Sequence, residues 1–161
     1  LNKYESRDVV LIYPSNTILD AIQSVLDQFP DLKDRIEAVP NKGTVSAAAV
    51  LTTSGTMSLR CGLAGIPGRI VHAVNVFSYI VGRMVLTIPY IGIANLLLDK
   101  PFYPEFTQYK AKPLLLAEEL NRCLTDQALI ESTKADSMVL RDLLAEGNTE
   151  TPWSWLQRFL G

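Results

Sequence analysis

The chain has 161 residues, of which 48% are hydrophobic and 20% are charged, and its formal net charge at pH 7 is −2. This length and composition predict one folded domain with a single core and exclude a disordered chain. The slight acidic excess gives no electrostatic basis for binding DNA or RNA, so we expect no nucleic-acid partner.

The first forty residues alternate between strand and helix patterns. Residues 8–14, DVVLIYP, form a short apolar run rich in β-branched residues, which is typical of a buried parallel strand. Apolar residues at three- and four-residue steps then predict an amphipathic helix that is capped within residues 15–17 and ends at Pro30. Residues 35–40, RIEAVP, are the second strand candidate.

The next segment continues this alternation. Residues 45–53, VSAAAVLTT, predict a brief helical turn leading into a third strand, and residues 54–64, SGTMSLRCGLA, predict a helix that is closed by Gly65 before Pro67. Residues 69–74, RIVHAV, are a fourth strand. Such alternation predicts an α/β fold with a parallel sheet flanked by helices, in which ligands bind at the carboxyl ends of the strands.

The remaining residues contain more helix and less strand. We expect an apolar helix over 79–85, an irregular stretch over 87–108, and two Leu-rich helices over 113–125 and 126–146. Residues 151–161, TPWSWLQRFLG, predict a short terminal helix with an apolar stripe. Two tryptophans in eleven residues indicate that this helix docks on a domain outside the chain.

The cysteines and the single histidine offer little chemistry. Cys61 and Cys123 lack metal-ligand spacing and lie among apolar neighbours, so we expect buried, reduced thiols. His72 lies in an apolar strand and is expected to be a hydrogen-bonded core residue, not a catalytic base. We therefore expect no metal ion and no cofactor.

The sequence also limits where the protein acts. The N-terminus lacks the basic-then-apolar order of a secretory signal, and His72, Asn75, Arg83 and Pro89 interrupt the most apolar region. We expect a cytoplasmic protein without a membrane span, and peripheral contact with the inner membrane stays open.

The turn at Ser54, Gly55 and Thr56 lies where a predicted strand gives way to a predicted helix. Unpaired backbone N–H groups and the positive end of the helix dipole meet there and would stabilise an anion. Gly55 lets a ligand approach the backbone, and the two hydroxyls can donate hydrogen bonds to phosphate oxygens. The alternative is that Ser54 or Thr56 serves only as the helix N-cap.

Two motifs occur in order along the chain. The first is Ser-Gly-Thr at 54–56 with Gly-Ile-Pro at 65–67, and the second is Asn-Leu-Leu at 95–97 with Pro-Glu-Phe at 104–106 and Gln108. Together they resemble the C-terminal half of lipid-A-disaccharide synthase, a GT-B glycosyltransferase whose donor is a UDP-linked, doubly acylated glucosamine. The resemblance runs from the first predicted strand to the end of the chain.

The resemblance implies a Rossmann-like domain of the GT-B C-terminal type and a donor site. In the family, the helix after the Ser-Gly-Thr turn cradles the nucleotide diphosphate and the Asn-Leu-Leu loop lies against the nucleotide, so residues 54–56 and Asn95 inherit these roles. Glu105 and Gln108 become the candidates for contacts with sugar or ribose hydroxyls. For Glu105 the alternative is a solvated loop carboxylate.

Arg60 departs from the family pattern. Family members usually carry a Glu early in this helix, which accepts hydrogen bonds from the ribose hydroxyls in related enzymes, and a guanidinium donates but cannot accept. We hypothesise that Arg60 instead faces a phosphate or a carboxylate such as Glu105. The alternative is that Arg60 is a surface residue.

The family's N-terminal acceptor domain, with its general base, and the first strand–helix unit of its C-terminal domain have no counterpart in this sequence. We therefore expect residues 1–161 to form a single UDP-sugar-binding domain that binds without catalysing, and we expect its own N-terminal domain or a partner chain to supply the base. The implied reaction moves diacylglucosamine from UDP-diacylglucosamine to a lipid monosaccharide phosphate.

Two other functions stay open. One is a different UDP-sugar enzyme such as an epimerase, against which the apolar, Tyr-rich stretch at 77–103 favours a lipid-linked substrate. The other is a non-catalytic nucleotide-sugar-binding subunit that needs a partner chain.

Overall fold

The computed structural model of the chain describes residues 9–41, 46–53, 55–72, 90–107 and 111–145. Its contacts divide the chain into two compact units, residues 1–44 and residues 45–161. In each unit parallel strands are flanked by helices, which confirms the α/β class and agrees with a Rossmann-like domain. The expectation that residues 1–161 act as one donor-binding domain stays a prediction.

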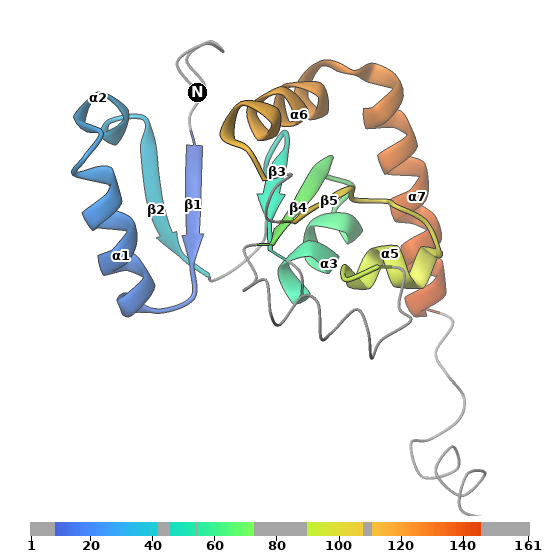
Figure 1. The fold of residues 1–161 in the computed structure, drawn as a ribbon. Helices are drawn as coiled ribbons and strands as arrows, with labels where there is room; N and C mark the ends of the chain where they lie inside the picture. Colours follow the sequence, from blue (N-terminus) through green and yellow to red (C-terminus); the bar gives the residue numbers. More distant parts are fainter. Residues whose placement is uncertain (1–8, 42–45, 54, 73–89, 108–110, 146–161) are drawn as a thin grey trace, which may run out of the picture. The chain divides into compact units, whose positions relative to one another are not determined.

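The first unit contains a pair of parallel strands (Figure 1). In their register, Val9 lies opposite Ile36. Its elements are β1 (Val9–Tyr13), α1 (Asn16–Leu26), α2 (Pro30–Lys33) and β2 (Ile36–Pro40). Both predicted strands and the predicted helix are confirmed. Pro30 begins α2 a few residues beyond the end of α1, because the first position of a helix does not need the N–H that proline lacks.

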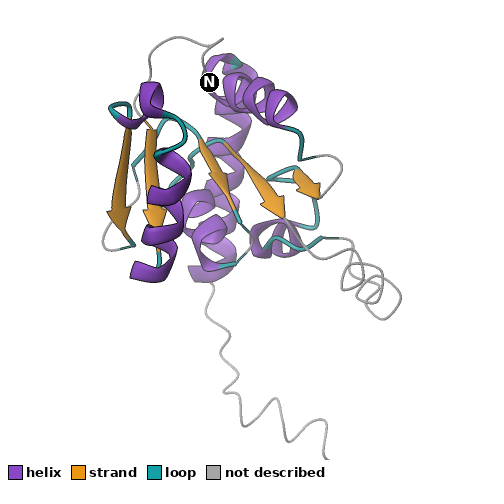
Figure 2. Ribbon diagram, turned by 60° about the vertical axis from the view of Figure 1, so that its left-hand side comes forward, coloured by secondary structure: helices purple, strands orange, loops and turns teal. Residues whose placement is uncertain are grey.

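The second unit contains a three-stranded parallel sheet in the order β3-β4-β5, with helices around it (Figure 2). Its elements are β3 (Val50–Thr52), α3 (Thr56–Leu63), β4 (Gly68–His72), α5 (Ile93–Leu98), β5 (Glu105–Thr107), α6 (Pro113–Thr125) and α7 (Gln127–Ala145). Across the sheet, Thr52 lies opposite Ile70 and Ile70 lies opposite Glu105. All carboxyl ends of these strands therefore lie at one edge.

The structure corrects two secondary-structure predictions. The stretch 87–108 is not irregular throughout, because α5 and β5 lie within it. Residues 46–49 form no helical turn before β3. The helices expected at 79–85 and 151–161 lie outside the described residues, whereas the two Leu-rich helices are confirmed as α6 and α7.

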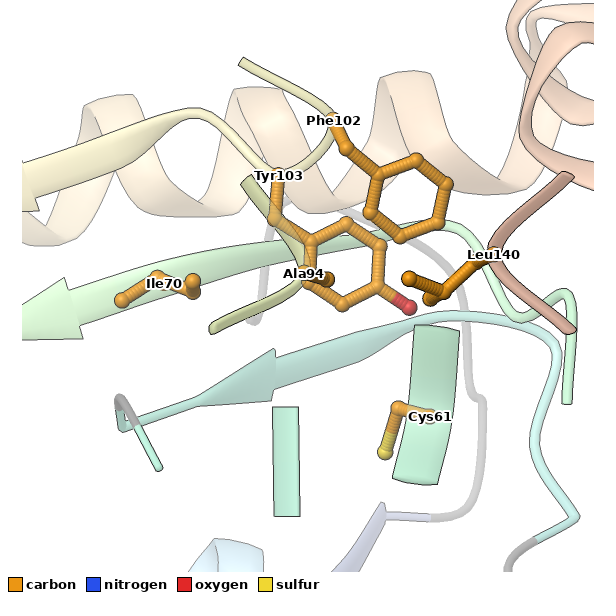
Figure 3. Close-up of a cluster of buried hydrophobic side chains, with 6 residues drawn as sticks. All are labelled: Cys61, Ile70, Ala94, Phe102, Tyr103 and Leu140. Atoms are coloured by element: carbon orange, nitrogen blue, oxygen red, sulfur yellow. The ribbon is translucent and has the colours of Figure 1, made fainter. Parts of the chain in front are cut away.

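The core of the second unit lies on one face of β4. Ile70 is fully buried in a cluster with Cys61 of α3, Ala94 of α5 and Leu140 of α7, and the Phe102 ring belongs to the same cluster (Figure 3). Tyr103 is the sixth member of the cluster, and its hydroxyl donates a hydrogen bond to the Ile66 carbonyl. Burial of this phenol raises its pKa, so Tyr103 stays protonated.

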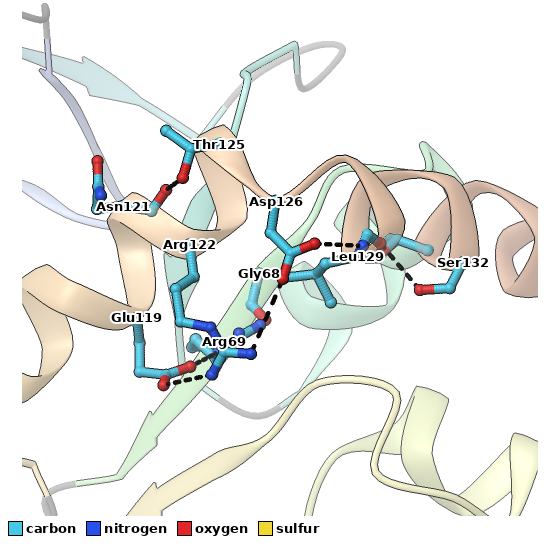
Figure 4. Close-up of polar contacts among 10 residues, drawn as sticks. Gly68, Arg69, Glu119, Asn121, Arg122, Thr125, Asp126, Leu129 and Ser132 are labelled. Atoms are coloured by element: carbon cyan, nitrogen blue, oxygen red, sulfur yellow. Dashed lines mark hydrogen bonds and ion pairs between the residues drawn. The ribbon is translucent and has the colours of Figure 1, made fainter.

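The opposite face of β4 carries a buried ion pair. Arg69 Nε donates to Glu119 Oε2 of α6 at 2.7 Å, and Arg122 Nη1 donates to Glu119 Oε1 at 3.1 Å (Figure 4). Burial tends to raise the pKa of the Glu119 carboxyl, but its hydrogen bonds and ion pairs with Arg69 and Arg122 outweigh that effect and lower the pKa. Helix α6 is therefore tied to the central strand by charge.

Two smaller predictions are confirmed. Cys61 and Cys123 are free and buried, and burial raises the pKa of both thiols. Helix α3 closes at Gly65, which has φ +67°, and the Ile66 N–H turns back to the Cys61 carbonyl at 3.1 Å. Among the described residues, no helix has the length and apolar character needed to cross a bilayer.

Candidate functional site

The turn between β3 and α3 is open and conformationally special. Gly55 has φ +112° and ψ −157°, a backbone region that is essentially confined to glycine. Apart from its chain neighbours, no described residue would lie within 4 Å of a Cβ placed on Gly55. The backbone torsion, and not close packing against the described residues, therefore demands glycine here, and none of those residues fills the space beside the backbone.

Two backbone donors of this turn have no acceptor among the described residues. The Gly55 carbonyl accepts from Ser58 Oγ at 2.7 Å and from the Leu59 N–H at 3.3 Å, which fixes the first turn of α3. In the part of the chain that the structure describes, no residue accepts a hydrogen bond from the N–H of Thr56 or Met57. These two donors lie at the positive end of the helix dipole and suit an anion.

Thr56 is not the N-cap of α3. The N-cap is Gly55, which has no side chain, and Thr56 is the first helical residue with an exposed side chain. The alternative that Thr56 serves only as the cap is therefore wrong. Ser54 lies outside the described residues, so its role stays a prediction.

Asn95 lies at the centre of a buried hydrogen-bonded cluster. Its Nδ2 donates to the Tyr103 carbonyl at 2.8 Å and to Glu105 Oε1 at 2.9 Å, and its Oδ1 accepts from the Tyr103 N–H at 2.8 Å. The side chain is fully buried, with 0% of its surface exposed. A direct contact between Asn95 and a nucleotide would require breaking bonds that hold β5 next to α5.

Glu105 is bound mainly by amides at the start of α5. Its Oε1 accepts from the N–H groups of Ile91 and Gly92 at 2.9 Å and 2.8 Å. Among the described residues, Oε2 accepts one bond, from the same Ile91 N–H at 3.1 Å. These partners differ from the hypothesised partner Arg60. The Oε2 atom keeps acceptor capacity, because a carboxylate oxygen has two lone-pair sites.

Gly92 allows this arrangement by its small size. A Cβ on Gly92 would clash with Ile70 Cδ1 and would lie 3.3 Å from Glu105 Oε1. Sequence reasoning missed Gly92 and Tyr103 as parts of the site. The signal for Gly92 was a glycine inside an apolar run, which often marks a close approach of the backbone to another element.

Of the remaining predicted residues, Arg60 has an exposed side chain on α3, and its contact with a phosphate stays a prediction. Gln108 lies outside the described residues.

His72 is half-buried at the end of β4. Its Nε2 is buried without a hydrogen-bond partner among the described residues, so the prediction of a hydrogen-bonded histidine is wrong for this atom. The structure thus brings Asn95 and Glu105 together and leaves Gly55 and Thr56 accessible.

The described residues also contain a pocket, and they were considered as ligands for a metal ion. A shallow pocket is lined by residues 46–48, residues 64–67 and Lys134, at the end of α3 away from Gly55. Within the described ranges, no group of three or more His, Cys, Asp or Glu side chains could hold a metal ion. The predicted ligand site thus differs from this pocket: it lies at the carboxyl edge of the sheet, where backbone amides follow β3 and precede α5.

Comparison with known proteins identifies the relatives of the chain. A family model described as lipid-A-disaccharide synthetase matches residues 36–158. The lipid-A-disaccharide synthase of Geobacter sulfurreducens is 33% identical over 99 residues, which are 62% of this chain and 26% of that protein. The lipid-A-disaccharide synthase of Anaeromyxobacter dehalogenans is 31% identical over 142 residues, or 86% of this chain and 37% of the relative. That of Gluconobacter oxydans is 26% identical over 140 residues, or 85% of this chain and 33% of the relative.

These matches confirm the resemblance that the two sequence motifs predicted. The chain spans about a quarter to two-fifths of the length of these curated relatives.

Proposed function

The chain belongs to the lipid-A-disaccharide synthetase family, and from this premise we propose that it supplies the donor-binding domain of a glycosyltransferase of lipid A biosynthesis. The donor is UDP-diacylglucosamine, and the acceptor is a lipid monosaccharide phosphate. The residues that bind the donor are Gly55, Thr56, Arg60 and Glu105, together with Ser54 and Gln108.

The observation that carries the proposal is the open turn at Gly55. In the described part of the chain, the N–H groups of Thr56 and Met57 have no acceptor, and apart from the chain neighbours of Gly55 no residue fills the space beside it. Negative charge grows on the leaving UDP as the glycosidic bond breaks. Donors that are fixed before the reaction stabilise such charge, typically by about 2.7–4 kcal/mol for each strong donor.

Asn95 and Glu105 have different roles in binding the sugar or the ribose of the donor. Asn95 acts as a positioning residue, because both polar atoms of its side chain bind Tyr103 or Glu105. Glu105 Oε2 accepts a hydrogen bond that a hydroxyl of the sugar or ribose donates, because Oε2 has fewer contacts with the described residues than Oε1. The amides of Ile91 and Gly92 hold the carboxylate in place for this contact.

The domain binds the donor and does not complete the reaction alone. A general base for the acceptor hydroxyl comes from the protein's own N-terminal domain or from a partner chain. We expect the apolar acceptor to bring the assembled enzyme to the surface of the membrane.

Calorimetric titration of the chain with UDP tests the proposal, and amide chemical shifts locate the ligand. Saturable binding that perturbs residues 54–60 and the amides of Ile91 and Gly92 is the expected result. Uridine, which lacks phosphates, serves as the control and should bind more weakly. Perturbation confined to residues 64–67 and Lys134 would instead place the ligand in the shallow pocket and would contradict the proposed site.

A further inference from the structure

The imidazole of His72 lies on the same face of β4 as the core. Side chains alternate between the two faces of a strand, so His72 shares its face with Ile70, which belongs to the same buried cluster as Cys61 and Ala94 (Figure 3). Arg69 lies on the other face, where it pairs with Glu119 (Figure 4). His72 is therefore on the side of the sheet where α3 and α5 lie.

His72 also lies at the carboxyl edge of the sheet. It is the last residue of β4 and pairs with Thr107, the last residue of β5. Ile70, two residues earlier, already reaches the residue before α5, because its Cδ1 occupies the space next to Gly92. Two further residues of strand carry His72 about 7 Å beyond Ile70, toward the edge where the turn at Gly55 follows β3.

The Nε2 atom of His72 is unusual among the buried polar atoms of the second unit. It is buried, and no hydrogen bond reaches it from the described residues. Other buried polar side chains of this unit, including Asn95, Ser58 and Thr52, are hydrogen-bonded within the protein. A buried polar atom without a partner is uncommon in folded proteins and asks for a specific explanation.

We propose that His72 is a donor-binding residue whose Nε2–H donates a hydrogen bond to a diphosphate oxygen of the bound nucleotide. This inference rests on the proposed function and adds a residue that neither sequence motif contains. A diphosphate oxygen is the partner of choice because the Thr56 and Met57 N–H groups at the same edge also favour an anion. In the neutral imidazole, Nε2 then carries the proton and Nδ1 does not.

The chain offers a clean probe of this contact, since His72 is its only histidine. Nitrogen-15 chemical shifts of the imidazole, followed during titration of the whole chain with UDP, report on Nε2 directly. We expect saturation with UDP to shift the Nε2 resonance and uridine to leave it nearly unchanged. A residue with a purely structural role would show no such selectivity.

Substitutions supply the second readout. His72→Phe removes the hydrogen bond and keeps an aromatic ring, and it should weaken UDP binding about tenfold while changing uridine binding little. His72→Gln keeps an N–H donor at a similar distance from the backbone and should recover part of the affinity. Circular dichroism establishes that each variant is folded.

The possible outcomes distinguish a failure of this inference from a failure of the proposed function. If the wild-type chain binds no UDP, the proposed function and the inference both fail. If the wild-type chain binds UDP but the Nε2 resonance does not move, or if a folded His72→Phe variant binds UDP equally well, only the inference fails. An equal loss of UDP and uridine affinity would also overturn it, because the hydrogen bond would then not reach the diphosphate.

Discussion

Two polar regions of the second unit differ in how their hydrogen bonds are used. At the Gly55 turn, the N–H groups of Thr56 and Met57 have no acceptor among the described residues, and the space beside the glycine is open. In the cluster around Asn95, both polar atoms of the Asn95 side chain are hydrogen-bonded, and none of the surface of Asn95 is exposed.

The comparison separates recognition from positioning. A group that binds a ligand must keep donors or acceptors available, whereas a group that positions its neighbours uses all of them inside the protein. Residue type alone does not distinguish the two, since asparagine and backbone amides can do either. The following changes test this division, beginning with the largest expected effect.

Replacing Asn95 tests the positioning role. Asn95→Leu has a similar volume but leaves the buried N–H and carbonyl of Tyr103 without partners. We expect the free energy of unfolding to fall by about 3 kcal/mol, as measured by urea denaturation followed by circular dichroism. The exposed Gln127→Ala on α7 is the control and should change stability by less than about 0.5 kcal/mol. A loss below about 1 kcal/mol for Asn95→Leu would show that the cluster does not depend on its bonds.

Replacing Glu119 extends the comparison to a third polar region, in which an ion pair with Arg69 supplies the hydrogen bonds. Glu119→Gln leaves the buried Arg69 without its counter-charge and should cost about 2 kcal/mol at neutral pH. Because the folded-state pKa of Glu119 is lowered, its contribution is complete above the unfolded pKa near 4.5 and is lost as the pH falls through the folded value.

Urea denaturation from pH 7 down to pH 3 measures this difference. The gap in stability between the wild-type chain and Glu119→Gln should narrow below about pH 4.5. Asp27→Asn, which breaks an exposed pair with Lys33, is the matched control and should have little effect at any pH. A gap that stays constant with pH would mean that packing, and not charge, explains the loss.

Two glycines sharpen the comparison between a filled and an open site. Gly92→Ala forces a Cβ against Ile70 Cδ1, and Gly55→Ala forces an alanine into φ +112°; each should cost about 1.5 kcal/mol. Adding Ile70→Val removes the Cδ1 atom and should restore about 1 kcal/mol to Gly92→Ala only. A double-mutant cycle measured by urea denaturation checks this. Equal rescue of Gly55→Ala would contradict the open space beside Gly55.

The smallest expected change in stability accompanies a change in binding. Thr56→Val keeps the shape of an exposed side chain and removes its hydroxyl, so stability should change by less than about 0.5 kcal/mol. If the hydroxyl donates to a phosphate, UDP affinity measured by calorimetry should fall about tenfold. Thr125→Val on α6 is the control for loss of an exposed threonine hydroxyl. Unchanged UDP affinity in Thr56→Val would remove this residue from the site.

Much of the fold followed from the sequence. β-branched apolar runs indicated β1, β2, β3 and β4, and the helical spacing of leucines indicated α6 and α7. The end of α3 at Gly65 was also predicted, because a left-handed residue followed by proline is a local stop signal. The two motifs at 54–56 and 95–97 were enough to indicate the family.

The short elements were not visible in the same way. Helix α5 has six residues and β5 has three, so neither is long enough to display a period of its own. Pairing of β5 with β4 and the bonds from Asn95 to Tyr103 and Glu105 hold both in place. These contacts join residues that are apart in the sequence, so no local sequence pattern predicts them.

The sequence by itself therefore determined the α/β class, the longer elements and the family, because these depend on local periodicity, stop signals and motifs. Only the tertiary structure decided which polar groups are satisfied: Asn95 is fully bonded, the Thr56 N–H lacks an acceptor among the described residues, and the Nε2 of His72 is buried without a partner there. The reason is physical, since a hydrogen bond depends on the distance and direction between groups that the chain brings together only when it folds.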